Sequence, residues 1–284
     1  MRILKKILLL LLGFVVLWPL LSLAQAFVTF GTEIMNSNVV ITAHRGGAGY
    51  GPENSLSCIR RSVEAGVPSI EIDVQLTSDG HVVVCHDNSV NRTTNGKGRI
   101  SEMTLDELRA LRLVDSEGRV CNEGLPLLSE VLECIDGKAH LLLEIKRYKD
   151  TALELQRAVV EELRRYNAES WTTVQSFSDD TLLEIHSLNP TLRLEKLAFC
   201  KVMGLPLLID GGIRHFSFER YDFVESINFF YGGVSKSFVE DMHEHGKRVR
   251  IWTVDKPGRG KNLGVDGIIT DYPDLLMEYY GGKN

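Results

Sequence analysis

Short apolar runs alternate with segments of helical period along most of this chain, and this alternation constrains the fold more than any other feature. Strand-type runs occupy 39–44, 69–77, 82–86, 139–146, 172–177, 192–198, 224–229, 248–254 and 267–271. Helix-type segments occupy 54–65, 104–112, 127–135, 151–166, 178–187, 235–246 and 273–280. Such alternation is typical of a mostly parallel sheet covered by helices. About eight strand–helix units within 38–284 predict one α/β domain, a TIM (β/α)8 barrel, with an open doubly wound sheet as the alternative. Segment 200–222 fits neither type.

The first 32 residues form a separate hydrophobic segment. Arg2, Lys5 and Lys6 precede a stretch, 7–32, that contains no charged residue. The pattern is typical of a secretory signal peptide cleaved after the small-x-small run 24–26 (AQA). It also fits a retained membrane anchor, since about 20 residues span a bilayer, and a buried core helix is a third alternative. A signal or an anchor would place the rest of the chain outside the cytoplasm: periplasmic, extracellular, or membrane-anchored on the non-cytoplasmic side.

The charge balance excludes one class of partner. The formal net charge is −6, and the only charges in the first 32 residues are positive, so the remaining body is more acidic than the whole chain. Nucleic acid needs clustered Lys and Arg, so no nucleic-acid partner is expected.

The five cysteines are odd in number and lack a C-x-x-C pair, which indicates neither a disulfide framework nor a zinc site. One bridge between Cys121 and Cys134 stays open for an exported protein.

Carboxylates share one face of two strand-type runs. In SIEIDVQLT (69–77), Glu71 and Asp73 lie on the face opposite the isoleucines, and in HLLLEIK (140–146) Glu144 lies with Lys146. Carboxylates on inward faces of neighbouring strands are costly unless they are paired or bind a metal. Such an oxygen-rich site would suit one hard divalent cation, Mg²⁺ or Ca²⁺. The alternative is an exposed or salt-bridged edge in which Lys146 balances Glu144.

Two apolar runs end in a histidine beside a charged residue. His44-Arg45 ends the first run, and His86-Asp87 ends VVVCHD. Catalytic groups gather where barrel strands end, and histidines there can act as general acid and base. Arg45 is a planar donor suited to phosphate oxygens. Trp252 could wall the same pocket or pack in the core.

The loop after the first strand suggests a nucleotide site, but its glycines are wrongly spaced. Four glycines lie in ITAHRGGAGYGPENSL (41–56). Every placement of G-x-G-x-x-G on them meets Ala48, Pro52 or Asn54 where glycine is required. We therefore expect no nucleotide cofactor and interpret the loop as a tight turn that holds His44 and Arg45 at the strand end.

In their order along the chain, these motifs resemble the glycerophosphodiester phosphodiesterase family of the PI-phospholipase C-like phosphodiesterase superfamily. The resemblance runs through HRG (44–46), PENS (52–55), EID (71–73), TSDG (77–80), CHD (85–87) and NRTT (91–94). LPLLSEVLE, LLLEIK, VQSF, RIWTVD and GVDGIITDYP follow in the family's order, so that about residues 40–275 are covered.

This resemblance implies a TIM barrel that hydrolyses glycerophosphodiesters, in phospholipid-derived metabolism, to an alcohol and glycerol 3-phosphate with a divalent metal. The residues that match the family's motifs take three implied roles: His44 and His86 as the acid/base pair, Arg45 and Lys146 as phosphate ligands, and Glu71, Asp73 and Glu144 as metal ligands. Which histidine is the acid stays open.

The chain departs from the family's pattern in four places. Ser55 replaces the usual Thr, Asp255 replaces the usual Asn, 255–266 is shortened, and 111–128 is brief where some members carry an inserted domain. A short insertion leaves the mouth more open. That openness and the N-terminal segment favour an alternative, lysophospholipase D-like hydrolysis of lysophospholipids with membrane association. A non-enzymatic lipid-binding barrel is the second alternative.

Overall fold

The computed structural model describes residues 39–146, 153–202 and 204–281. The expected signal peptide or anchor, 1–32, lies outside these residues. Among the helices described, none is both long enough and apolar enough to cross a membrane.

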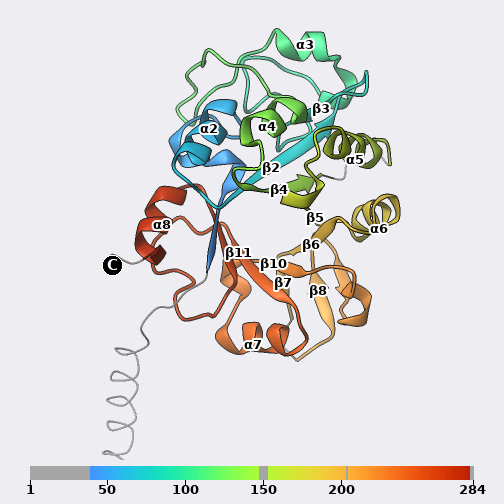
Figure 1. The fold of residues 1–284 in the computed structure, drawn as a ribbon, viewed down its shortest axis with the longest axis vertical. Helices are drawn as coiled ribbons and strands as arrows, with labels where there is room; N and C mark the ends of the chain where they lie inside the picture. The colour runs from blue at the N-terminus through green and yellow to red at the C-terminus, as the bar shows by residue number, and fades with distance from the viewer. Residues whose placement is uncertain (1–38, 147–152, 203, 282–284) are drawn as a thin grey trace, which may run out of the picture. The chain divides into compact units, whose positions relative to one another are not determined.

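Eight parallel strands form a closed barrel, as the alternation predicts (Figure 1). In barrel order they are β1 (Val40–Ala43), β2 (Ser69–Leu76), β4 (His140–Ile145), β5 (Thr172–Ser176), β6 (Arg193–Ala198), β10 (Ser226–Phe230), β11 (Arg248–Trp252) and β12 (Gly267–Thr270). β1 pairs with both β2 and β12, which closes the barrel. The open doubly wound sheet is therefore excluded.

Helices follow most barrel strands. They are α2 (Leu56–Glu64), α4 (Leu128–Ile135), α5 (Glu154–Arg165), α6 (Asp179–Leu188), α7 (Lys236–Glu244) and α8 (Pro273–Gly281), with a short α3 (Leu105–Arg109) outside the barrel units. Single-turn 3-10 helices occupy η1 (His44–Gly46), η2 (Ala48–Tyr50), η3 (Ile100–Glu102), η4 (Glu169–Trp171), η5 (Glu219–Tyr221) and η6 (Tyr231–Gly233). Between β6 and β10 a three-stranded antiparallel sheet replaces the helix, and with η5 it occupies much of the unassigned segment 200–222. Its strands are β7 (Cys200–Lys201), β8 (Leu207–Ile209) and β9 (Ile213–His215).

The run 82–86 is not a barrel strand, contrary to its apolar pattern. Val82–Val84 forms β3, which pairs antiparallel with the end of β2. β2 is eight residues long and projects beyond its neighbours, and a turn at Thr77 and Gly80 sends the chain back along it. β3 therefore returns His86 toward the mouth of the barrel, where the Cys85 amide donates to the Asp73 carbonyl (2.9 Å).

The two faces of each barrel strand have opposite chemistry. Outward-facing Ile70, Ile72, Leu141 and Leu143 belong to the core between strands and helices. The inward face of β2 carries buried polar side chains, among them Gln75. A second, smaller core lies under residues 83–127 and contains Val83, Cys85, Val90, Ile100, Leu108, Leu113 and Leu125. All five cysteines are free, so no bridge joins Cys121 to Cys134.

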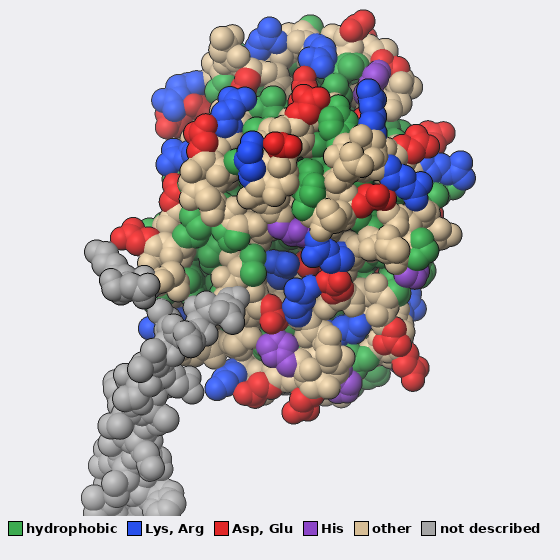
Figure 2. Space-filling model, viewed as in Figure 1, with side chains coloured by type: hydrophobic (Ala, Val, Ile, Leu, Met, Phe, Trp, Pro, Cys, Tyr) green, Lys and Arg blue, Asp and Glu red, His purple; other side chains and the backbone are tan. Residues whose placement is uncertain are grey.

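Charged side chains of both signs are interspersed over the face shown in Figure 2. No large patch of one sign appears on that face among the described residues.

Candidate active site

A pocket at the carboxyl ends of the barrel strands contains the residues singled out by sequence. It is lined by His44, Arg45, Glu71, His86, Glu144, Lys146, Gln175, Phe177, Leu197, Trp252, Thr253 and Ile269. Asp73 lies beside them on β2 and is opposite Glu144 in the strand register. The structure thus brings all eight predicted site residues to one mouth, as a TIM barrel requires of an active site.

Three buried carboxylates lie together at this pocket: Glu71 and Glu144 line it, and Asp73 lies beside them. Glu71, Asp73 and Glu144 each offer an oxygen within 4.8 Å of the other two, and their exposed fractions are 1%, 1% and 6%. The Arg45 amide donates to Glu71 (2.8 Å), and the Asn54 amide side chain donates to Asp73 (2.9 Å). This all-oxygen, preorganised donor set fits a hard divalent cation.

Burial and mutual repulsion shift the acidities of these carboxylates. Burial and the Asp73 charge raise the pKa of Glu71 to about 8. Burial also raises the pKa of Glu144, although Lys146 opposes it. For Asp73 burial acts in the same direction, but the positive charges around it, Lys146 first, and the Asn54 hydrogen bond together outweigh burial and lower the pKa below the usual range. A bound cation would allow all three groups to ionise together.

The two predicted phosphate ligands are engaged with acidic partners. The Lys146 ammonium lies 2.6 Å from Glu144 and 3.0 Å from Asp73. Burial alone would lower the pKa of Lys146, but these two carboxylates raise it, so the ammonium stays charged. The Arg45 guanidinium donates to Glu53 (2.9 Å) and lies 3.7 Å from Asp73. Both cations line the pocket, where they would face a bound anion.

Each histidine is oriented by a carboxylate. His44 Nδ1 lies 2.6 Å from Asp271 Oδ1, and His86 Nδ1 lies 2.7 Å from Asp87 Oδ1. Ionised carboxylates accept, so these bonds place a proton on Nδ1 and assign proton exchange to Nε2.

The two histidines differ in acidity. Burial alone would lower the pKa of His44, but the Asp271 hydrogen bond and the Glu71 charge raise it. Burial also lowers the pKa of His86, and there Lys146 and Arg45 act in the same direction. At neutral pH His44 is therefore the more readily protonated ring.

A second set of residues supports the site and was not found from sequence. Arg92 donates to both oxygens of Asp87 (2.7 and 3.0 Å) and to both oxygens of Glu53 (2.6 and 2.8 Å). Arg92 thus links the partner of His86 to the partner of Arg45. The matching NRTT motif was its only sequence signal. Asp271 could have been suspected because it follows the last barrel strand, next to the strand that ends at His44.

The glycine loop is a tight turn, as expected. Arg45, Gly46 and Gly47 have φ values of 50°, 79° and 100°, in the region that favours glycine. A Cβ on Gly46 would lie 2.8 Å from the Ile59 side chain. The turn therefore packs directly on α2 while holding His44 and Arg45 at the mouth.

Two residues that depart from the family's pattern make hydrogen bonds that the usual residue could also make. Ser55 caps α2 by accepting from the Cys58 amide (3.2 Å), as a threonine would. Asp255 Oδ1 accepts from the Asp271 amide (2.9 Å) and the Thr270 hydroxyl (3.2 Å). An asparagine oxygen could accept the same bonds, so the aspartate adds a negative charge behind the partner of His44.

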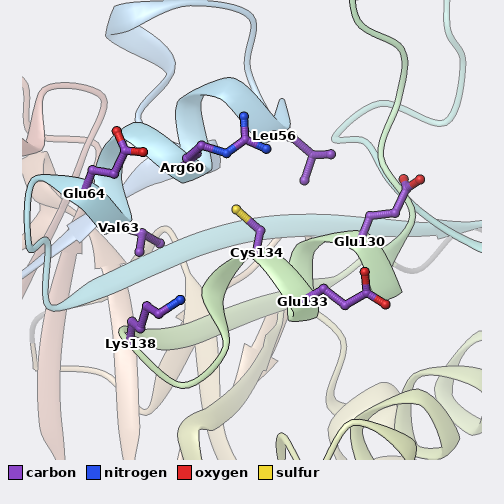
Figure 3. A pocket seen from close by; sticks show the side chains of 8 residues that line it. All are labelled: Leu56, Arg60, Val63, Glu64, Glu130, Glu133, Cys134 and Lys138. Atoms are coloured by element: carbon purple, nitrogen blue, oxygen red, sulfur yellow. The ribbon is translucent and has the colours of Figure 1, made fainter.

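Another pocket lies on the outer surface between α2 and α4 (Figure 3). It is lined by Leu56, Arg60, Val63, Glu64, Glu130, Glu133, Cys134 and Lys138. Burial raises the pKa of the Cys134 thiol, which makes it a poor nucleophile. None of the motif residues lines this pocket, and we assign the active site to the barrel mouth.

Comparison with known proteins agrees with this geometry. The Glycerophosphoryl diester phosphodiesterase family matches residues 44–275. A glycerophosphodiester phosphodiesterase of Caldanaerobacter subterraneus subsp. tengcongensis is 33% identical over 243 residues, which cover 84% of this chain and 96% of that protein.

Solved structures share the fold. A glycerophosphodiester phosphodiesterase from Parabacteroides distasonis superposes with a TM-score of 0.70 at 27% identity, covering 86% of this chain and 98% of the other. An Oleispira antarctica phosphodiesterase, solved in complex with the product sn-glycerol-3-phosphate, superposes with a TM-score of 0.75 at 25% identity, covering 85% and 96%. With this site at its barrel mouth, the chain belongs to the glycerophosphoryl diester phosphodiesterase family and is a phosphoric diester hydrolase.

Proposed function

We propose that this protein hydrolyses glycerophosphodiesters to an alcohol and glycerol 3-phosphate, with one divalent cation, Mg²⁺ or Ca²⁺. The observation that carries the proposal is the placement of three buried carboxylates, two cations and two carboxylate-paired histidines around one pocket. The Oleispira relative, solved with sn-glycerol-3-phosphate, supports this choice of product. Because the chain is a family member with these side chains in place, the lipid-binding barrel is not favoured.

Glu71, Asp73 and Glu144 would hold the cation, which supplies Lewis-acid polarisation of the phosphoryl oxygens when bound. Arg45 and Lys146, at the edge of the same carboxylates, would bind the remaining phosphate oxygens. Charge that develops on the phosphoryl group would then be stabilised by groups already in position.

We assign His44 as the general acid and His86 as the general base. The raised pKa of His44 keeps a proton for the leaving alcohol, and the lowered pKa of His86 leaves it able to accept one. His86 would deprotonate the nucleophile, which is water or the glycerol hydroxyl next to the phosphoester.

A substrate panel tests the proposal. Residues 38–284 would be incubated with glycerophosphocholine, -ethanolamine, -inositol and -glycerol in the presence of Mg²⁺ or Ca²⁺. We expect release of glycerol 3-phosphate, with losses of at least about 100-fold for His44→Ala and His86→Ala. Full turnover by either variant, or indifference to a chelator, would refute the assignment. His81→Ala is the matched control, since His81 lies on the turn between β2 and β3 and is about half exposed.

We also propose that residues 1–32 direct export, so that this chemistry occurs outside the cytoplasm. The uncharged stretch 7–32 behind Arg2, Lys5 and Lys6 supports it. A reporter active only outside the cytoplasm, fused after residue 284, should be active, and activity of a cytoplasm-only reporter would contradict export.

A further inference from the structure

The barrel interior beside the three carboxylates holds a layer of polar side chains. Barrel interiors are usually filled by bulky apolar side chains. In this chain the inward faces of the neighbouring strands β5, β6, β10 and β11 instead carry Gln175, Glu195, Asn228 and Arg250, all of them buried. Burial of polar groups is costly unless they are hydrogen-bonded, so the partners of these four side chains indicate what the layer does.

Glu195 and Arg250 form an ion pair within this layer. Arg250 Nε lies 3.1 and 3.0 Å from the two carboxylate oxygens of Glu195. Gly267, the register partner of Arg250, leaves room for the guanidinium, because a Cβ there would lie 2.9 Å from Arg250 Nη1. Apolar side chains of similar volume often stabilise a protein as well as a buried ion pair does. Stability alone therefore does not explain the pair.

The charge of Glu195 fixes the orientation of two amide side chains. An ionised carboxylate only accepts, so Asn228 Nδ2 donates to Glu195 (2.7 Å), and Asn228 Oδ1 accepts from the Ser226 hydroxyl (2.8 Å). Asn228 Nδ2 also donates to Gln175 Oε1 (3.0 Å). The oxygen of Gln175 is thereby engaged, and its Nε2 group faces Glu71 Oε1 at 3.5 Å.

Gln175 therefore presents a donor to the carboxylates, although it lines the catalytic pocket. A glutamine that bound a hard cation would do so through Oε1, which here accepts from Asn228. A separation of 3.5 Å is long for a hydrogen bond, so its main consequence is orientation. The amide hydrogens attract one oxygen of Glu71 and leave the other for the cation.

We propose that Gln175 and Asn228 are positioning residues for the cation. Gln175 orients the Glu71 carboxylate, and Asn228 holds Gln175 in the orientation that Glu195 and its partner Arg250 require. Residues that orient a metal ligand in this way commonly change metal affinity by about 10- to 100-fold when they are replaced. The proposal rests on the cation of the proposed function, since Glu71 has this role only where a cation binds.

The test measures binding of Mg²⁺ or Ca²⁺ to the full chain in detergent solution by calorimetry, without substrate. Gln175→Met keeps the length of the side chain and removes the donor, so Kd should rise about tenfold or more. Asn228→Leu frees the Gln175 amide to turn and should raise Kd by about threefold to tenfold. The double variant should lose no more than Gln175→Met alone, because Asn228 acts through Gln175.

Gln156→Met is the matched control. Gln156 on α5 is also buried and donates to a carboxylate, that of Glu184 (2.6 Å), but it does not line the catalytic pocket. Its replacement should leave Kd unchanged. If Asn228→Leu does not fold, Asn228→Ser takes its place with the same expectation.

A second measurement separates positioning from a structural role. Tm is recorded with chelator and with saturating cation, and the rise in Tm on cation addition should be smaller in both variants than in the parent. At saturating cation, kcat should return to within about threefold of the parent value, because the chemistry is intact.

Three results would overturn the proposal. They are an equal Kd in the parent and both variants, additive losses in the double variant, or a lowered kcat at saturating cation with Kd unchanged, which would place Gln175 on the substrate. A parent that binds no cation would refute both this proposal and the cation of the proposed function. A parent that binds cation, with the expected losses in the variants, but hydrolyses no glycerophosphodiester would refute the proposed function alone.

Discussion

Replacement of Asp271 by asparagine should separate the orientation of His44 from its charge state. Asp271 Oδ1 lies 2.6 Å from His44 Nδ1, and its side chain is 30% exposed. Asparagine can still accept a hydrogen bond through Oδ1, so the ring orientation is preserved. It cannot stabilise the imidazolium by charge, and the pKa of His44 should fall.

The expected size follows from the kind of bond that is lost. A hydrogen bond to a charged partner contributes about 1.5–3 kcal/mol. Partial exposure of Asp271 argues for the lower half of this range. About 1.5–2 kcal/mol corresponds to a fall of about 1–1.5 in the pKa of His44. Because the general acid must be protonated, kcat/KM at neutral pH should drop about 10- to 30-fold and recover partly at lower pH.

The assay is the pH profile of kcat/KM for the parent and Asp271→Asn enzymes. The limb at high pH should move to lower pH, while the limb set by His86 stays in place. Asp266→Asn is the matched control, since Asp266 lies 2.8 Å from His243, away from the residues that line the pocket. An unchanged profile for Asp271→Asn, or a shift of the low-pH limb alone, would refute the assignment of His44 as the acid.

Three further predictions concern stability. In the cation-free protein the folded-state pKa of Glu71 is raised from 4.5 to about 8, so the free energy of unfolding should fall as the pH rises between these two values. Glu71→Gln should make the accompanying fall in Tm shallower. If Tm depended on pH equally in the variant and the parent, this prediction would be contradicted. Lys196 is fully buried, 2.8 Å from Asp210 and 3.1 Å from Asp179. Lys196→Met should therefore lower the free energy of unfolding, measured in urea, by about 3–5 kcal/mol, because it leaves buried carboxylates without their partner. A loss under about 1 kcal/mol would contradict a stabilising role for this ion pair. Gly46→Ala should lower Tm more than Gly66→Ala. Both glycines have positive φ, but only a Cβ on Gly46 would meet a side chain, 2.8 Å from Ile59. Equal losses of Tm would contradict this reasoning.

The inward carboxylates were predictable because a strand has a strict two-residue period. Once the apolar face of 69–77 is buried against helices, Glu71 and Asp73 must point into the barrel. The same reasoning places Glu144 on β4. The histidine and arginine at the end of the first strand followed from the barrel topology, in which strand ends converge.

Other features depend on contacts between distant segments and left no local pattern. His44 and Asp271 are 227 positions apart and meet only because β1 pairs with β12. The run 82–86 has the composition of a barrel strand, but the turn before it makes the strand antiparallel to β2. The strands between β6 and β10 are two or three residues long, too short to show a period.

The most direct test of the proposed function is phosphorus NMR of glycerophosphocholine during incubation with residues 38–284 and Mg²⁺ or Ca²⁺. The account predicts conversion to glycerol 3-phosphate, which stops on chelation and resumes when the cation is restored. It also predicts that Glu71→Gln requires more cation for the same rate, with weaker cation binding by calorimetry. Phosphocholine as the product, or undiminished conversion under chelation, would contradict the central claim.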